Sequence, residues 1–130
     1  MIESLNPLQS WAFMQQDPAA VLVDVRTKIE YDFVGHPLGA VHIVWKEAPD
    51  WQINPAFVEQ VEAVVKDRKV PVLLLCRSGQ RSLDAAVKLQ EAGYTHLINI
   101  IEGFEGPLDA NKQRGNLGGW RYHNLPWEQS

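Results

Sequence analysis

Uninterrupted apolar runs recur along the chain and predict the strands of a buried sheet. They occupy residues 20–25, 70–75 and 97–101, with a weaker run at 40–44. Continuous rather than alternating hydrophobicity is typical of parallel strands that are covered on both faces. Because helical patterns lie between the runs, we predict an α/β fold with a central, mostly parallel sheet flanked by helices.

Helix starts and ends separate the predicted strands. The Asn-Pro pairs at residues 6–7 and 54–55 each combine an N-capping side chain with a proline that suits the first helical turn. Thr27, with Glu30 three residues later, indicates a capping box for a short helix. Apolar residues at helical spacing fill residues 82–92, and a glycine follows as a good C-cap.

Beyond the last predicted strand, glycine, proline and polar residues predict a loop. Trp120, Tyr122 and Trp127 are nevertheless too apolar to be left in water, so we expect the irregular tail, residues 104–130, to pack on the body. The chain has 130 residues, of which 45% are hydrophobic. This is enough for an ordinary core, and we expect one domain over residues 1–130.

Charge and hydropathy exclude several classes of partner. The net charge of -4 argues against nucleic acid, which would require basic residues clustered on one face. No apolar stretch approaches the ~18 residues of a membrane span, and the start of the chain lacks the pattern of a signal peptide. We therefore expect a cytoplasmic protein without a membrane partner. The histidines show no zinc-like spacing, so no metal site is predicted.

The candidate chemistry lies in residues 72–82, Val-Leu-Leu-Leu-Cys-Arg-Ser-Gly-Gln-Arg-Ser. A predicted strand ends just before Cys76, the only cysteine, and a polar loop then leads into a helix. Ligands of α/β sheets bind at the carboxyl ends of strands, and the N–H groups of such a loop and helix converge on a small anion. We predict that Cys76 is a catalytic thiolate rather than a packing residue.

The residues that follow Cys76 are predicted to bind substrate: Arg77, Ser78, Gly79, Gln80 and Arg81. Gly79 allows backbone conformations that a Cβ would forbid. The two arginines could grip an oxyanion in a forked geometry. Alternatively, either arginine could lie on the surface or pair with a carboxylate such as Asp24. Ser82, Asp24 and Arg26 are expected to support the loop.

This arrangement resembles the rhodanese family, especially its small bacterial single-domain members. Residues 72–82 are similar to the family's active-site loop, and residues 23–31 and 35–43 resemble its first two motifs. Residues 102–104 and 118–126 resemble its closing motif. The resemblance implies a rhodanese-like three-layer domain.

The resemblance also implies a function, that of a thiosulfate sulfurtransferase. Cys76 would take a sulfane sulfur from thiosulfate or a similar donor, hold it as a persulfide, and pass it to a thiophilic acceptor such as cyanide or a thiol. No metal or organic cofactor is implied, and a sulfur-relay protein is left open as a further partner.

Other functions remain open from the sequence. A sulfur carrier or a partner-binding module of the same family would lack significant thiosulfate turnover. A phosphatase or arsenate reductase is a weaker alternative, suggested by the similar fold of the cell-cycle dual-specificity phosphatases. Those enzymes place five residues between cysteine and arginine, whereas four separate Cys76 from Arg81. The smaller loop favours a single sulfur atom over a tetrahedral phosphate.

The chain departs from the family pattern in two places, a turn at residues 36–40 and a longer stretch near the loop. Residues 105–117 are inserted where the family runs almost directly from glycine to tryptophan. The insertion could cover the mouth of the site or lie on the surface. Trp45 and Trp51 are expected to pack, with a pocket wall or a partner contact as the alternative.

Overall fold

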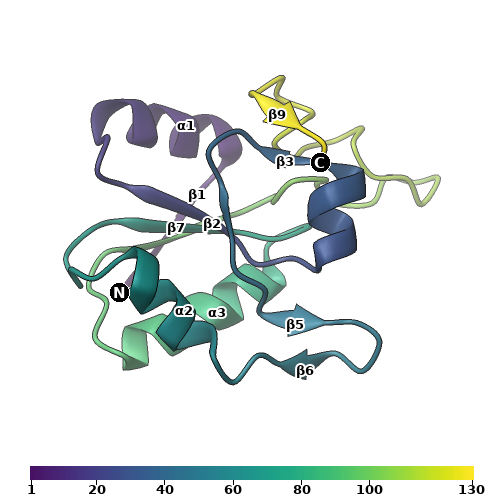
Figure 1. Ribbon diagram of the computed structural model, residues 1–130. Helices are drawn as coiled ribbons and strands as arrows, with labels where there is room; N and C mark the ends of the chain where they lie inside the picture. Colours follow the sequence, from purple (N-terminus) through teal and green to yellow (C-terminus); the bar gives the residue numbers. More distant parts are fainter.

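A five-stranded parallel sheet forms the centre of the computed structural model, which describes residues 1–130 (Figure 1). Leu73 of the middle strand aligns with Leu22 on one side and with Ile98 on the other. In spatial order the strands are β1 (Ile2–Leu5), β8 (Leu97–Ile100), β7 (Val72–Leu75), β2 (Val21–Asp24) and β4 (Val41–His42). The predicted α/β class with a parallel sheet is confirmed.

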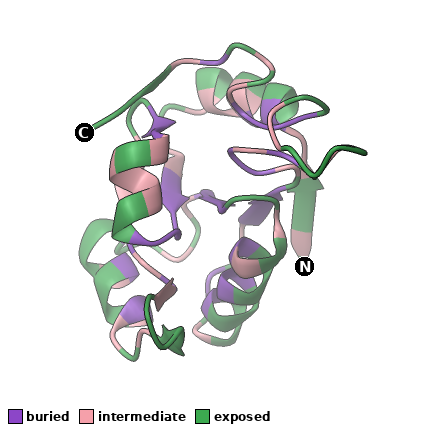
Figure 2. Ribbon diagram, turned by 90° about the vertical axis from the view of Figure 1, so that its right-hand side faces the viewer, coloured by how far each residue is buried: buried purple, intermediate pink, exposed green.

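Helices cover both faces of the sheet. The helices α2 (Phe57–Val64) and α3 (Gln80–Glu91) lie on one face, and α1 (Pro7–Gln16) lies on the other (Figure 1). Alternate strand residues face the two layers, so Leu74 packs with α2 and α3 whereas Leu73 packs in the cluster beside α1. Figure 2 shows the buried residues on the central strands and on the helix sides that face them. No helix has the length and apolar character needed to cross a membrane.

Five short strands lie outside the predicted set. β1 is an edge strand whose central residues are exposed, so it has no continuous apolar run. The others form two-residue antiparallel pairs, β3 (His36–Pro37) with β9 (Trp127–Glu128), and β5 (Lys46–Glu47) with β6 (Gln52–Ile53). Pairs this short leave no periodic signal in the sequence.

Two predicted helix starts match the structure. At α1, Asn6 Oδ1 accepts the backbone N–H of Gln9 at 2.8 Å, and Gln9 returns the bond to form a capping box. At the short π-helical segment η1 (Glu30–Val34), Thr27 Oγ1 accepts the Glu30 N–H at 3.3 Å, and Glu30 Oε1 accepts the Thr27 N–H at 3.2 Å. The predicted capping box at Thr27 is therefore confirmed.

Two other helix starts differ from the prediction. α2 begins at Phe57 rather than at the Asn-Pro pair, because Asn54 Oδ1 accepts the Ala56 N–H at 3.0 Å and forms a turn first. α3 begins at Gln80 instead of Ser82. Gly79 adopts a φ of +119° there and turns the chain directly into the helix.

The segment after β8 packs on the same face of the sheet as α1. Phe104, Trp120 and Leu125 are buried in one cluster with strand residues. Tyr122 and Trp127 differ from the expectation, since they are 47% and 40% exposed. Trp127 lies in the short strand β9 at the rim, where its ring meets the Phe104 ring edge-on at 6.1 Å.

Candidate active site

Cys76 follows the last residue of β7 and faces the start of α3. Its side chain is buried, with 1% of the residue exposed. The sulfur accepts the backbone N–H of Gly79 at 3.1 Å, and the hydroxyl of Ser82 lies 3.3 Å from it. Both donors belong to the N-terminal end of α3, where the helix dipole places about half a positive charge. The sulfur therefore sits where a negative charge is stabilised.

Asn99 completes the surroundings of the sulfur, and the sequence analysis did not single it out. Its Oδ1 accepts the Ser82 hydroxyl at 2.5 Å, and its Nδ2 donates to the Gly79 carbonyl at 3.1 Å. It is 4% exposed on β8, and it is the one polar residue in the run Leu-Ile-Asn-Ile. A polar side chain in a buried strand was the signal that could have found it.

Arg81 forms a forked ion pair with Glu30. Its Nη1 and Nη2 donate to the two carboxylate oxygens at 2.8 and 2.9 Å. Burial alone would raise the pKa of Glu30, but the hydrogen bonds and charge of Arg81 outweigh it and hold that pKa at about 2. The ion pair joins α3 to η1. The partner of Arg81 is thus Glu30 and not Asp24, the example considered from the sequence.

Asp24 and Arg26 form a buried pair of their own. Arg26 Nε and Nη2 donate to the Asp24 carboxylate at 2.9 and 2.6 Å, and both side chains are fully buried. Arg26 Nη2 also donates to the Gly35 carbonyl at 2.6 Å, and its guanidinium lies 4.5 Å from the centre of the Phe104 ring. These contacts hold the end of β2 against the C-terminal segment.

Gly103 allows that segment to approach the loop closely. It has a φ of +62°, and a Cβ at this position would lie 2.5 Å from the Cys76 carbonyl oxygen. The neighbouring Phe104 N–H donates to the same oxygen at 2.9 Å, and the Glu105 N–H donates to the Arg77 carbonyl at 3.0 Å. The closing segment therefore supports the loop through its backbone.

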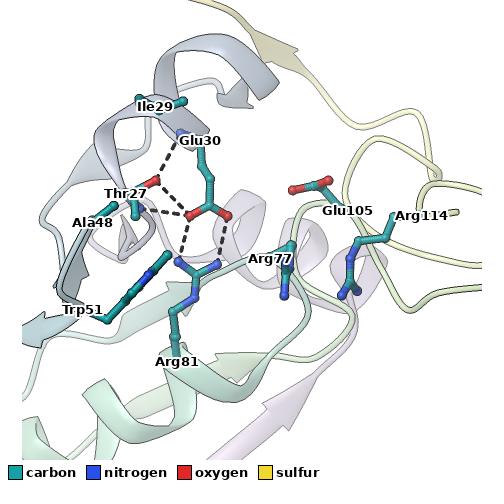
Figure 3. A pocket seen from close by; sticks show the side chains of 9 residues that line it. All are labelled: Thr27, Ile29, Glu30, Ala48, Trp51, Arg77, Arg81, Glu105 and Arg114. Carbon is teal, nitrogen blue, oxygen red and sulfur yellow. Dashed lines mark hydrogen bonds and ion pairs between the residues drawn. The ribbon is translucent and has the colours of Figure 1, made fainter. Parts of the chain in front are cut away.

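A pocket of about 490 Å³ opens beside the loop (Figure 3). Of the predicted substrate-binding residues, Arg77 and Arg81 line it; the backbone of Gly79 faces the sulfur instead. Ser78 is exposed, and the exposed Gln80 side chain donates to Asp84. The full lining is Thr27, Ile29, Glu30, Ala48, Trp51, Arg77, Arg81, Glu105 and Arg114.

The insertion at residues 105–117 forms part of this pocket. Glu105 and Arg114 line it, and Arg114 Nη1 donates to the Gly106 carbonyl at 2.7 Å. Asp109 organises the rest of the insertion by accepting bonds from backbone and side-chain donors. Two residues of the insertion therefore line the pocket beside the loop, which agrees with the first of the two alternatives that the sequence left open.

The two tryptophans take different roles. Trp45 is 5% exposed and packs edge-on against Phe57, as a core residue does. Trp51 is 49% exposed, lines the pocket, and lies 5.7 Å from the Arg81 guanidinium. The expectation of packing therefore holds for Trp45, whereas Trp51 is a pocket wall.

No group of three or more His, Cys, Asp and Glu side chains is placed to hold a metal.

Comparison with known proteins identifies the family. The family model of the rhodanese-like domain matches residues 9–109. The chain belongs to the rhodanese-like family. A crystal structure of Rv0390 from M. tuberculosis is 41% identical, covers 98% of each chain, and superposes with a TM-score of 0.89.

Two relatives of this rhodanese-like domain differ in what is known of them. An uncharacterized protein of Rickettsia conorii is 33% identical over 98% of both chains. The thiosulfate sulfurtransferase GlpE of Haemophilus influenzae is 32% identical over 80% of this chain and 86% of its own.

Proposed function

We propose that this rhodanese-like domain is a sulfurtransferase that moves a sulfane sulfur from thiosulfate or a similar donor to a thiophilic acceptor. The observation that carries the proposal is the Cys76 sulfur at the start of α3, which accepts the Gly79 N–H and lies 3.3 Å from the Ser82 hydroxyl. The similarity to the thiosulfate sulfurtransferase GlpE supports the same chemistry.

In the first step, the Cys76 thiolate attacks the outer sulfur of thiosulfate. A new S–S bond forms, the bond within thiosulfate breaks, and sulfite leaves with the electron pair. The product is a Cys76 persulfide, and the total charge is unchanged because a thiolate and the thiosulfate dianion become a persulfide anion and the sulfite dianion. The Gly79 N–H and the helix dipole favour the negative sulfur throughout.

In the second step, a thiophilic acceptor attacks the outer sulfur of the persulfide. The acceptor gains that sulfur, and Cys76 leaves as a thiolate ready for another cycle. A strand-end cysteine with donors already in place needs little rearrangement between the steps, which is the advantage of a preorganised site. The scheme requires no metal and no organic cofactor.

Intact mass spectrometry before and after incubation with thiosulfate tests the proposal. We expect wild-type protein to gain the mass of one sulfur atom, and cyanide or a thiol to reverse the gain. The Cys76→Ser variant should gain nothing. If thiosulfate leaves the wild type unchanged while a persulfide-bearing protein loads it, the domain is a sulfur carrier and not a thiosulfate sulfurtransferase.

A further inference from the structure

Three charged side chains at the pocket lack an ionic partner. Glu30 and Arg81 neutralise each other there, whereas Arg77, Glu105 and Arg114 have no oppositely charged side chain within 4.0 Å. Glu105 and Arg114 are also half-buried. Keeping half-buried charges unpaired costs free energy, and such charges in a cleft indicate a site for a charged ligand.

The opposite wall of the pocket is apolar. Ala48 and Trp51 lie on one side of the pocket in Figure 3, and Glu105 and Arg114 lie on the other. Ile29, on the apolar side, is 66% exposed. Trp51 adopts a φ of +56°, a conformation that is uncommon for a side chain of this size and is concentrated at functional sites.

The volume of the pocket exceeds what an inorganic sulfur compound needs. A volume of about 490 Å³ lies within the range of ~300 to 1,000 Å³ that is typical of pockets for small organic ligands. Cyanide and thiosulfate are only a few atoms in size, so they would leave most of this space to water. The pocket therefore has room for an organic group attached to the reacting sulfur.

We propose that the sulfur acceptor is a peptide-sized thiol that carries both carboxylate and ammonium groups. Arg77 and Arg114 would bind a carboxylate, Glu105 would bind the ammonium, and Trp51 would pack against the aliphatic part. Both insertion residues, Glu105 and Arg114, are then specificity determinants. The chemistry of the step rests on the proposed function, whereas the recognition of the ligand does not.

The transfer step balances without an oxidant. The thiolate of the acceptor attacks the outer sulfur of the Cys76 persulfide, and a new S–S bond forms on the acceptor. The S–S bond to Cys76 breaks, and Cys76 leaves with the electron pair as a thiolate. The acceptor departs as its persulfide, and any proton on the outer sulfur travels with it.

Binding without turnover tests the recognition site first. S-methylglutathione keeps the carboxylates and the ammonium but cannot accept sulfur, and its Kd is measured by calorimetry. We expect Arg77→Gln and Arg114→Gln each to raise the Kd about five- to tenfold, the value of one partly screened charge-assisted contact. Lys112→Asn removes an exposed charge from the same insertion outside the pocket, and it should leave the Kd unchanged.

Turnover with a matched pair of acceptors then separates recognition of the ligand's carboxylate from recognition of its ammonium group. Glutathione is compared with its diethyl ester, which keeps the thiol and the ammonium but has no free carboxylate. Arg114→Gln should raise the KM for glutathione and not for the ester, whereas Glu105→Gln should raise both. Comparing each thiol with itself in wild type and variant cancels differences in intrinsic thiol reactivity.

The two proposals fail in different ways. The proposed recognition site is overturned if S-methylglutathione does not bind, or if Lys112→Asn weakens its binding as much as the arginine variants do. This holds even when thiosulfate loads Cys76. Equal effects of Arg114→Gln on glutathione and its ester would overturn it as well. If binding behaves as expected and no donor loads Cys76, the site stands and the sulfurtransferase proposal fails. Arg77 makes no side-chain hydrogen bond, so its variant keeps the test valid should Arg114→Gln disturb the insertion.

Discussion

Next to the Cys76 sulfur, the Ser82 hydroxyl has three acceptors within reach of its single proton. The Ser82 oxygen lies 3.3 Å from the sulfur, 2.5 Å from Asn99 Oδ1 and 3.2 Å from the Gly79 carbonyl. A hydroxyl donates only one bond. Donation to a charged sulfur is the strongest of the three options, so the hydroxyl should turn to the sulfur when it is ionised or loaded.

The Ser82→Ala variant tests this role in the reaction. Removing the hydroxyl should lower the second-order rate constant for persulfide formation from thiosulfate about ten- to hundredfold, because one hydrogen bond to an ionised group is worth ~1.5 to 3 kcal/mol. The rate is followed by quenched mass spectrometry, with stability checked by urea unfolding. Ser10→Ala is the matched control, since Ser10 is equally buried and its hydroxyl has no partner. A rate equal to that of wild type in Ser82→Ala would contradict the role.

At the scale of elements, the ion pair between Arg81 and Glu30 joins α3 to η1 at the edge of the pocket. Both side chains are 17% exposed, so the pair is better shielded than the surface pair between Arg68 and Glu62. The Glu30 carboxylate also accepts hydrogen bonds from Thr27. Glu30 therefore takes part in the capping box of η1 and also anchors the first turn of α3.

The Glu30–Arg81 pair makes stability depend on pH in a definite direction. The pKa of Glu30 is depressed from 4.5 to about 2 in the folded protein. The contribution of the Glu30 carboxylate to the free energy of unfolding is therefore complete above pH 4.5 and is lost as the pH falls toward 2. After allowance for solvent screening, we expect Glu30→Gln to cost ~1 to 2 kcal/mol at pH 7, with the difference from wild type shrinking below pH 4.5.

Urea unfolding at several pH values between 7 and 3 measures that difference. Glu62→Gln removes a carboxylate from an exposed pair and should cost less than ~0.5 kcal/mol at any of these values. A Glu30→Gln deficit that stays constant with pH, or that grows in acid, would show that the carboxylate charge does not stabilise the protein.

The elements also show which parts of the fold a sequence can reveal. The central strands β2 and β7 appear in the sequence as apolar runs because both of their faces are buried. The edge strand β1 does not, because its outer side chains meet water.

The site residues also differ in how well the sequence predicts them. Cys76 follows from its place between strand and helix, whereas the pairing of Arg81 with Glu30 links residues too distant in sequence for any local pattern.

At the scale of the whole molecule, both ends of the chain stabilise the layer opposite α3. Trp120, from the C-terminal segment, is fully buried and meets Trp11 of α1 edge-on at 6.1 Å. Its indole N–H donates to the Pro126 carbonyl at 2.8 Å, which fastens the last turn of the chain. Leu73 and Ile98 from the centre of the sheet complete the same cluster. The sequence indicated that this tryptophan should be buried, but not which face of the sheet it would cover.

Trp120→Ala should therefore remove a large part of the total stability. Replacing a buried tryptophan by alanine leaves a cavity and costs ~3 to 5 kcal/mol, against ~5 to 15 kcal/mol for unfolding a typical domain. Trp127→Ala makes the same chemical change at a residue that is 40% exposed, and it should cost less than half as much. Urea unfolding of both variants, monitored by circular dichroism so that the lost fluorophore does not matter, gives the comparison. Equal losses would mean that the C-terminal segment is held mainly at its rim, through β9, and that the buried cluster under α1 contributes little to the stability of the fold.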